Sequence, residues 1–575
     1  MDNISRFQKT TGVGQILDES FARCPEREAI VFGDWRITYR ELQALIYRTA
    51  HCLRSLGIAP GDRVAIISRN CPEVMIAEIA ILKLGGTVVK FNWRLAPEEM
   101  IYLLDLNEVR CAFFKPERED WGDALRQHYA GRITFLSLTP EADGRSALYS
   151  LLAGMPDTPV ETVVAPDAPA YHMHTSGTTG RPKCVVYSHA RYLNQLESML
   201  ETLEFPDGQV YQYISQLFHS ACTGAYLTLA TGGKLIMIPN FTVSDYVESL
   251  VREKVRAIGV IPLILQGILD EMDRKNYDLS HLKVINYSTC PISPDLLRRA
   301  LDRLNCRFYQ SYGMTEMAST VTALLPEDHL ILGGRALPGA AVRIVRPDGS
   351  LCDAGEEGEI CVRGQGMMLG YYQMPEKTAD VIRDGWYFTH DVGYLDEDGY
   401  LYLRGRKDSL IISGGENIYP EEVIDVLLKM PEIAEAAVYG MPDPKWGEHV
   451  KASIVCKPGR SLTEESVRML GIERFYTDCM DKIRAMREYF AEEGIDPANA
   501  IYMGDDIPDL ECMQAVGLPV CPADGDAFCR SDHGDAKKQG RCCGPAFDRE
   551  MRFYSPSPNS FSMASLSAPS ALCCA

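Results

Sequence analysis

Long hydrophobic runs are missing from this chain of 575 residues, in which no stretch of about 18 apolar residues occurs. The first ten residues are polar, so the start of the chain does not look like a secretory leader. Excess positive charge is also missing, because 79 acidic residues outnumber 58 basic ones and the net charge is −21. We therefore expect a cytoplasmic protein with no transmembrane segment and no nucleic-acid partner, with peripheral membrane contact left open.

A disulfide framework is not expected either, although the chain has 19 cysteines. Residues such as Cys71, Cys111 and Cys361 are single and lie in apolar segments, where a reduced cysteine behaves as a small hydrophobic side chain. Hydrophobic residues make up 46% and charged residues 24% of the chain, as in ordinary globular proteins. The length exceeds one typical domain, so the expectation is a multidomain protein.

Short apolar runs alternate with helical patterns in the first half of the chain. Thr38 and Glu41 have the spacing of a capping box, which predicts the start of a helix. The pattern then predicts a strand over Val64–Ser68, a helix over Pro72–Leu84 and a strand over Thr87–Asn92. This alternation is typical of an α/β fold, with parallel or mixed sheets covered by helices.

The most distinctive stretch runs from His174 to Lys183 and concentrates hydroxyls, glycines and cations in one turn. Glycines let backbone N–H groups approach an anion, hydroxyls donate hydrogen bonds, and a lysine adds positive charge. The stretch is not a Walker A motif, because Pro182 precedes the lysine and Cys184 follows it. The candidate phosphate-binding residues are Thr175, Ser176, Gly177, Thr178, Thr179, Gly180 and Lys183.

The apolar runs on both sides of this loop, Ala170–Met173 and Cys184–Tyr187, predict two short strands. The loop would then lie at the tip of a strand–loop–strand unit. Taken alone, the pattern also fits a Gly/Thr-rich hairpin turn with solvated cations.

Four further motifs follow in a fixed order: Tyr312–Glu316, Thr389–Asp391, Gly405–Asp408 and Ser413–Asn417. Together with the loop, they make residues 16 to about 465 resemble the adenylate-forming superfamily of acyl-CoA synthetases, luciferases and peptide-synthetase adenylation domains. The resemblance implies a large adenylating domain over residues 1–407 and a small C-terminal domain over residues 408–466 that is truncated.

The resemblance also implies a two-step reaction. A carboxylic acid attacks the α-phosphate of ATP with Mg²⁺ as cofactor, giving acyl-adenylate and pyrophosphate, and the thiol of CoA then displaces AMP. Such a reaction needs orientation and charge stabilisation rather than a covalent enzyme intermediate. We expect a fatty acid as the first candidate substrate and an aryl acid as the second.

The family's residue roles map onto particular positions here. Tyr312 would offer an aromatic face to adenine, Thr315 a hydroxyl to a phosphate, and Glu316 a carboxylate to Mg²⁺, which prefers oxygen ligands. The simpler interpretation is a capped loop in which Thr315 and Glu316 serve the backbone. His219 would lie beside the carboxylate of the acid, although a single histidine at a strand end is often only structural.

Asp391 would accept both hydroxyls of the ribose, and Arg406 would contact the ribose or the α-phosphate. His390 stands where relatives usually have glycine, so it adds bulk near the nucleotide. Asp408 matches the hinge about which the small domain of the family rotates.

The small domain would contribute to CoA binding. Gly414 and Gly415 would line the tunnel for the pantetheine arm, and Trp446 would stack on the CoA nucleotide. Pro420 predicts the start of a helix over Glu421–Leu428.

After Glu465 the resemblance stops, because the Pro-Lys…Gly-Lys motif of the family, whose last lysine assists adenylation, is not found. Residues 467–525 instead resemble the C-terminal part of haloacid-dehalogenase-type phosphatases, nearest the branch acting on a phosphorylated octulosonate. Lys482 and the Gly504–Asp509 stretch, after a predicted strand over Ala500–Met503, carry that likeness. Residues 526–575 are rich in Ser, Pro, Gly and Cys, which predicts disorder.

The sequence also bears on three other functions. A peptide-synthetase module would need a carrier attachment motif after the small domain, and a phosphatase would need the nucleophilic Asp of its missing first half. A protein that binds nucleotide or acyl-adenylate without full turnover stays open, because the missing lysine predicts impaired adenylation.

Overall fold

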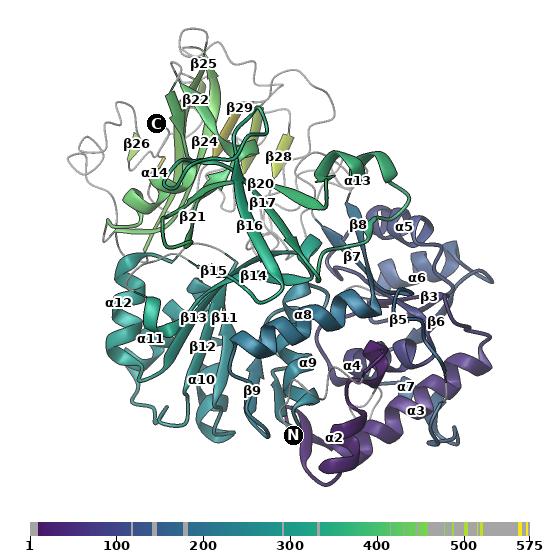
Figure 1. Ribbon diagram of the computed structural model, residues 1–575. Helices are drawn as coiled ribbons and strands as arrows, with labels where there is room; N and C mark the ends of the chain where they lie inside the picture. Colours follow the sequence, from purple (N-terminus) through teal and green to yellow (C-terminus); the bar gives the residue numbers. More distant parts are fainter. Residues whose placement is uncertain are drawn as a thin grey trace. The chain divides into compact units, whose positions relative to one another are not determined.

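Figure 1 shows the computed structural model, in which the chain divides into two compact units, Met1–Leu403 and Arg404–Ala575. The structure describes residues 10–116, 119–140, 146–160, 162–175, 182–289, 292–329, 334–413, 416–430, 432–443 and 447–457, together with short pieces up to residue 572. The boundary between the units falls within β21 (Leu401–Arg406).

A nine-stranded sheet forms one half of the large unit, in the order β15-β14-β13-β12-β11-β9-β10-β1-β2. Its inner strands are parallel, and the antiparallel pairs are β1 with β2, β13 with β14 and β14 with β15. The strands are β1 (Glu28–Phe32), β2 (Trp35–Thr38), β9 (Val210–Tyr213), β10 (Lys234–Met237), β11 (Ala257–Val260), β12 (Val284–Ser288), β13 (Arg307–Met314), β14 (Ser319–Leu324) and β15 (Arg335–Ala336).

A seven-stranded sheet forms the other half, in the order β18-β8-β7-β4-β3-β5-β6. Strands β7, β4, β3, β5 and β6 are parallel, whereas β8 is antiparallel to both β7 and β18. The strands are β3 (Arg63–Ile67), β4 (Thr87–Lys90), β5 (Cys111–Phe114), β6 (Thr134–Ser137), β7 (Pro169–Thr175), β8 (Lys183–Ser188) and β18 (Gly370–Tyr371).

Helices cover these sheets and fill the space between them, so the predicted α/β fold is confirmed (Figure 1). Helix α8 contacts strands of both sheets, and α10, α11 and α12 pack against one another. The helices are α2 (Asp18–Arg23), α3 (Tyr39–Ser55), α4 (Pro72–Lys83), α5 (Pro97–Leu106), α6 (Glu119–His128), α7 (Leu148–Leu152), α8 (His189–Thr202), α9 (Thr223–Ala230), α10 (Val243–Arg252), α11 (Pro262–Arg274), α12 (Pro294–Arg303) and α13 (Pro375–Val381), with short 3₁₀ turns η1 (Val13–Gln15), η2 (Ser220–Cys222), η3 (Thr315–Met317), η4 (Pro326–Asp328) and η5 (Lys407–Ser409).

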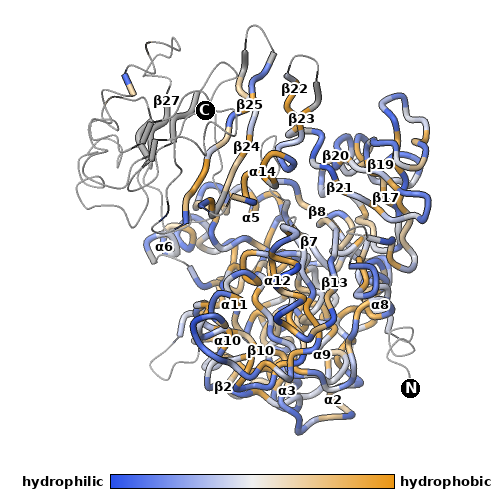
Figure 2. Tube along the Cα trace, turned by 90° about the vertical axis from the view of Figure 1, so that its left-hand side faces the viewer, coloured by the Kyte–Doolittle hydropathy of each residue, from blue (hydrophilic) through white to orange (hydrophobic). Residues whose placement is uncertain are grey.

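Local sequence signals explain where several of these elements begin. Helix α3 starts at the predicted capping box, in which Thr38 and Glu41 bond each other's backbone. Helix α4 starts at Pro72 and is buried on all sides, because it lies in the core rather than on the surface. Cys111 and Cys361 are buried as small apolar side chains. Figure 2 shows hydrophobic stretches through the interior of the large unit.

A third, antiparallel sheet completes the large unit, in the order β16-β17-β20-β19, with β21 beside β20. Its strands are β16 (Ala340–Val345), β17 (Gly358–Gly364), β19 (Ile382–Arg383) and β20 (Trp386–Leu395). Strand β20 carries the Thr389–Asp391 motif. The turn that follows β20 is closed by hydrogen bonds to Asp396.

The second unit contains a four-stranded sheet in the order β23-β22-β25-β24, formed by β22 (Ile411–Ser413), β23 (Glu416–Ile418), β24 (Ile433–Asp443) and β25 (Gly447–Cys456). Helix α14 (Pro420–Leu427) contacts β24, and the predicted helix start at Pro420 is confirmed. Short strands follow at β26 (Tyr476–Thr477), β27 (Ala500–Met503), β28 (Leu518–Val520), β29 (Ser562–Ser565) and β30 (Ala571–Leu572), and the predicted strand over Ala500–Met503 is confirmed.

Several predicted features lie outside the described residues: Gly414, Gly415, Trp446, Lys482, Gly504–Asp509 and most of residues 526–575. Within the described part of the chain, no helix is long and apolar enough to cross a membrane.

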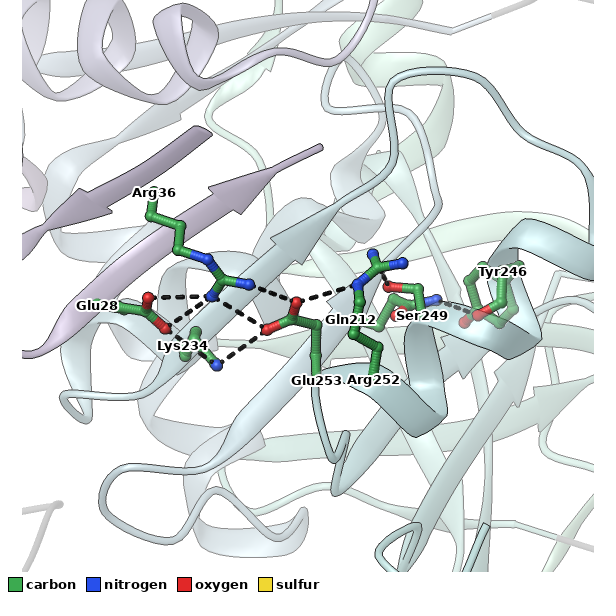
Figure 3. Close-up of polar contacts among 8 residues, drawn as sticks. All are labelled: Glu28, Arg36, Gln212, Lys234, Tyr246, Ser249, Arg252 and Glu253. Atoms are coloured by element: carbon green, nitrogen blue, oxygen red, sulfur yellow. Dashed lines mark hydrogen bonds and ion pairs between the residues drawn. The ribbon is translucent and has the colours of Figure 1, made fainter. Parts of the chain in front are cut away.

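A cluster of ion pairs lies at the amino-terminal end of β10 (Figure 3). The carboxylate of Glu253 follows α10, is 3% exposed, and lies 2.7 Å from Arg36 and 3.1 Å from Lys234. Both cations also contact Glu28, at 3.0 and 3.1 Å. The cluster therefore ties together β1, β2, β10 and the end of α10.

The Glu253 carboxylate should stabilise the fold in a pH-dependent way. Burial alone would raise its pKa, but hydrogen bonds from Arg36 and Lys234 outweigh burial and lower the pKa from 4.5 to about 2. Its contribution is therefore complete above about pH 4.5 and is lost as the pH falls toward 2. We expect Glu253→Gln to lower the free energy of unfolding at pH 7 by about 2 kcal/mol, less than the full shift because Arg36 is partly exposed.

Urea unfolding of both proteins at pH 7 and pH 4 measures this effect. The difference between wild type and Glu253→Gln should be smaller at pH 4 than at pH 7. Equal unfolding midpoints at pH 7 would show that the cluster does not stabilise the fold.

Candidate functional site

The predicted strand–loop–strand unit is present as β7 and β8, which pair so that Thr175 lies opposite Lys183. The predicted strands on both sides of the loop are thus confirmed. Residues 176–181, with Ser176, Gly177, Thr178, Thr179 and Gly180, lie outside the described part. The description of this site therefore rests on the stem of the hairpin and on the residues around it.

A buried polar network holds this stem. The Asn107 side-chain oxygen lies 2.8 Å from Nδ1 of His172 and accepts from the thiol of Cys184 at 3.2 Å. The Asn107 amide nitrogen lies 3.0 Å from Nε2 of His174. Burial lowers the pKa of His172 to about 3 and of His174 to about 4, so both rings are neutral at pH 7. Asn107 thus bridges both strands of the hairpin.

Lys183 and Glu316 both contact Tyr371. Strand β18 pairs with β8 so that Tyr371 lies opposite Val185, and the ammonium of Lys183 lies 4.9 Å from the centre of the Tyr371 ring. The Tyr371 hydroxyl donates to the Glu316 carboxylate at 2.8 Å. A cation at the end of the predicted phosphate-binding loop and a buried carboxylate are thereby brought together through a residue that the sequence motifs did not include.

The Tyr312–Glu316 motif turns sharply because β13 and β14 approach closely there. A Cβ atom on Gly313 would lie 1.7 Å from the backbone oxygen of Ser319, so only glycine fits at this position. The pairing of the two strands shifts between Tyr312 and Gly313, and η3 then carries Thr315 and Glu316. The backbone oxygen of Glu316 accepts from the N–H of Met368 at 2.8 Å, which fixes the turn.

The surroundings of Glu316 fit a hard cation. Its side chain is buried, and burial, followed by the Glu316 and Tyr371 groups, raises the pKa of the neighbouring Tyr387. The hydroxyl of Tyr387 is therefore uncharged at pH 7. An ionised carboxylate offers only oxygen acceptors, and Mg²⁺ is commonly held by one or two carboxylates together with substrate phosphates.

Asp391 is held from two sides. The hydroxyl of Tyr312 donates to its carboxylate at 2.6 Å, and its backbone N–H donates to the hydroxyl of Thr389 at 3.0 Å. The Thr389 hydroxyl in turn donates to the backbone oxygen of Ile360 at 2.8 Å. The contact between Tyr312 and Asp391 joins the end of β13 to β20, so two of the sequence motifs meet in space.

His390 adopts a left-handed backbone conformation, with φ of 62°. This conformation favours glycine, which explains why a glycine would be the ordinary residue between Thr389 and Asp391. The backbone N–H of His390 donates to the Glu359 carboxylate at 3.3 Å.

His219 lies on a separate segment after β9, directly before η2. Its side chain is exposed, and its ring centre lies 4.2 Å from that of Phe218. Asn70 holds the segment, because it accepts from the N–H of Leu217 at 2.9 Å and donates to the carbonyl oxygen of Ser215 at 2.8 Å.

The remaining predicted site residues belong to the second unit. Arg406 ends β21, and Asp408 lies within η5. Motif spacing could not have indicated Tyr371 or Asn107, because each acts through a partner far away in the sequence. Neither has a distinctive sequence signal, because Asn107 lies among charged as well as apolar residues and Tyr371 is one of two adjacent tyrosines.

Two family models and several known proteins match this chain. A family model described as "AMP-binding enzyme" matches residues 17–372, and one described as "AMP-binding enzyme C-terminal domain" matches residues 422–482. Among curated proteins, a feruloyl-CoA synthase of Amycolatopsis sp is 34% identical over 444 residues, covering 76% of this chain and 87% of the relative. A long-chain fatty-acid–CoA ligase of Mycobacterium tuberculosis is 31% identical over 461 residues, covering 79% and 90%.

Solved structures agree with these matches. An o-succinylbenzoate CoA synthetase of Bacillus subtilis, in complex with its acyl-adenylate intermediate, has a TM-score of 0.71 at 29% identity and covers 80% of this chain and 92% of that one. An ATP-bound protein of Rhodopseudomonas palustris has a TM-score of 0.73 at 26% identity and covers 84% and 99%.

Proposed function

Because the chain belongs to the family of AMP-binding enzymes, we propose that it activates a small-molecule carboxylic acid with ATP and transfers the acyl group to CoA. It is then an AMP-forming acid–thiol ligase, in line with relatives named as CoA ligases and synthetases. The observation that carries the proposal is the cluster of Lys183, Tyr371 and Glu316, which combines a cation at the phosphate hairpin with a buried carboxylate.

In the first half-reaction an oxygen of the acid carboxylate attacks the α-phosphorus of ATP, and the bond from that phosphorus to pyrophosphate breaks. No proton moves in this step, because the acid is already ionised at pH 7. The protein therefore has to orient the two substrates and stabilise charge. Lys183 would neutralise the β- and γ-phosphates, assisted by the hydroxyls and amides of residues 175–180, and Thr315 would donate to a phosphate.

Magnesium fits this scheme as a cofactor held by Glu316. The carboxylate oxygens of Glu316 would hold the ion, which would supply positive charge near the phosphates of ATP. Tyr371 would keep the Glu316 carboxylate in place through its hydrogen bond of 2.8 Å.

The nucleotide would lie near Tyr312, Asp391 and Arg406. Asp391 would accept both ribose hydroxyls, Tyr312 would face the adenine, and Arg406 would contact the ribose or α-phosphate. The hydrogen bond from Tyr312 to Asp391 supports this assignment, because it orients the carboxylate without using all of its acceptor capacity.

In the second half-reaction the sulfur of CoA attacks the acyl carbonyl carbon and loses its proton to solvent, and the bond from that carbon to the AMP oxygen breaks, which releases AMP. Gly414, Gly415 and Trp446 would bind the pantetheine arm and the nucleotide of CoA, and Asp408 would act as the hinge. We propose domain limits at residues 407, 466 and 525. The likeness of residues 467–525 to a phosphatase stays a hypothesis, and the family match that extends to residue 482 overlaps it.

The acid has a fatty chain in our first proposal, with His219 beside its carboxylate. An aryl acid is the second candidate, favoured by the relative named feruloyl-CoA synthase. Pyrophosphate release measured over a panel of fatty and aryl acids, with ATP, Mg²⁺ and CoA present, tests the proposal. At least one acid should give CoA-dependent thioester. If no acid of the panel gave pyrophosphate release, that result would contradict the proposed function.

Asp391→Ala is expected to raise the KM for ATP more than the KM for the acid, because its proposed partner is the ribose. Loss of charged hydrogen bonds of roughly 1.5–3 kcal/mol corresponds to about a 10- to 100-fold rise. Tyr312→Phe removes only the hydroxyl that positions Asp391 and should give a smaller change in the same direction. Equal changes in both KM values for Asp391→Ala would indicate a structural role instead.

The absent Pro-Lys…Gly-Lys motif should separate the two half-reactions. We expect acyl-adenylate to form from acid and ATP about 10²–10³ times more slowly than in a chain that has the motif, as for other lost electrostatic contacts. Thioester formation from presynthesised acyl-adenylate and CoA should be faster than this adenylation. The reference is a chain in which a family Gly-Lys segment is restored after Glu465. Equal adenylation rates for both chains would mean that another cation does this work.

If adenylation fails altogether while ATP still binds by calorimetry, the protein is a nucleotide- or acyl-adenylate-binding protein. The missing lysine motif is the observation that favours this second function.

A further inference from the structure

Lys90 ends β4, and only 1% of its side chain is exposed. An ammonium has three N–H donors and no acceptor. Nζ of Lys90 contacts three acceptors: Oε2 of Glu78 at 2.9 Å, the carbonyl oxygen of Leu217 at 2.9 Å and Sγ of Cys222 at 3.2 Å. The contacts within the protein therefore match the hydrogen-bonding capacity of the ammonium.

Glu78 lies on α4 and is equally buried. Its carboxylate accepts a hydrogen bond from the hydroxyl of Tyr226, which in turn accepts from the hydroxyl of Tyr171 at 3.0 Å. The rings of Tyr171 and Tyr226 also face the ammonium, with centres 5.1 and 5.6 Å from Nζ. Aromatic side chains thus enclose the ion pair of Lys90 and Glu78.

Stability alone does not explain this pair. Burying two charges costs several kcal/mol for each ion, and apolar side chains of similar volume would fill the same space without that cost. A buried ammonium differs from an apolar side chain in its directed contacts. Two of its three contacts are on the Leu217–Cys222 segment, which carries His219.

The backbone of Lys90 contacts the other half of the site. Its carbonyl oxygen lies 2.8 Å from Nδ1 of His174, and the neutral ring donates its N–H there, because Nε2 accepts from Asn107. His174 directly precedes Thr175 in the stem of the phosphate loop. One residue therefore touches both the segment proposed to face the acid and the stem proposed to hold ATP.

We propose that Lys90, with Glu78 as its counter-ion, is a positioning residue that fixes the Leu217–Cys222 segment against the stem of the phosphate loop. The inference rests on the proposed function and adds to it the residue that sets the acid carboxylate at the right distance from the α-phosphate. Neither side chain is proposed to touch a substrate.

The test uses the double variant Lys90→Met/Glu78→Gln, which removes both charges and leaves an amide oxygen for Tyr226. We expect kcat/KM for the acid to fall about 10- to 100-fold, because small misplacements of a reacting group cost rates of that order. The KM for ATP should change less than about threefold, because the backbone contact between Lys90 and His174 is kept. The single variant Lys90→Met should be less stable than the double variant, since it leaves the Glu78 charge unpaired.

A matched control is Lys234→Met/Glu253→Gln, which neutralises an ion pair at the amino-terminal end of β10. It should lower the unfolding midpoint and leave the acid KM unchanged. A folded Lys90→Met/Glu78→Gln variant with wild-type kinetics for the acid would overturn the positioning role. Equal falls in kcat/KM for the acid and for ATP in the Lys90 double variant would also overturn it. So would changes in that variant that are no larger than those in the control.

The readout stays decisive if the wild type releases no pyrophosphate with any acid. That result would overturn the proposed function, and binding of a non-hydrolysable acyl-sulfamoyl adenosine, measured by calorimetry, then decides the inference. Weaker binding by the Lys90 double variant than by wild type and control, with ATP binding kept, would support the positioning role. Equal affinities would overturn it.

Discussion

The register between β7 and β8 is the constraint on which the site depends. Thr175 lies opposite Lys183, so the two strands flanking the predicted phosphate-binding loop end at the same level of the sheet. A slip by one residue would turn every side chain of a strand to the other face of the sheet. The same register lets β18 pair with β8, which places Tyr371 where it meets both Lys183 and Glu316. The contacts among Lys183, Tyr371 and Glu316 thus depend on the correct pairing of β7 with β8.

Local signals predicted much of the fold, because they act over a few residues. The capping box at Thr38 and the prolines at residues 72 and 420 mark helix starts through hydrogen bonds and φ angles that neighbouring residues determine. The alternation of strands and helices predicted an α/β fold, but not that the parallel strands divide into two sheets. That division depends on which strands pair, and the pairing involves residues far apart in the sequence.

The candidate site was predicted in the same uneven way. The resemblance indicated Lys183, Glu316 and Asp391, yet the groups that hold them were not visible in the motifs. Tyr371 contacts Glu316 across 55 positions, and Tyr312 contacts Asp391 across 79. A single tyrosine has no spacing pattern that would identify such a partner. The predicted roles of the residues in the loop and in the second unit stay predictions.

Two ion-pair clusters in the large unit show what burial does to the use of charge. The cluster at Glu253 includes the partly exposed Arg36 and Lys234, so water shares in solvating it. The pair of Lys90 and Glu78 is sealed from water, and its geometry is therefore determined by protein atoms alone. The directed contacts of Lys90 therefore connect α4, β4 and the Leu217–Cys222 segment within the protein interior.

At His390 the left-handed backbone has a torsional cost, whereas the side chain reduces the conformational entropy of the unfolded chain. A glycine there would adopt the conformation without torsional cost, but it would also sample many more conformations in the unfolded chain and around the native one. The Cβ of His390 removes most of those alternatives. The chain therefore has a small steric cost in the folded state and a narrower distribution of peptide orientations immediately before Asp391, whose carboxylate accepts from Tyr312 and whose backbone N–H donates to Thr389.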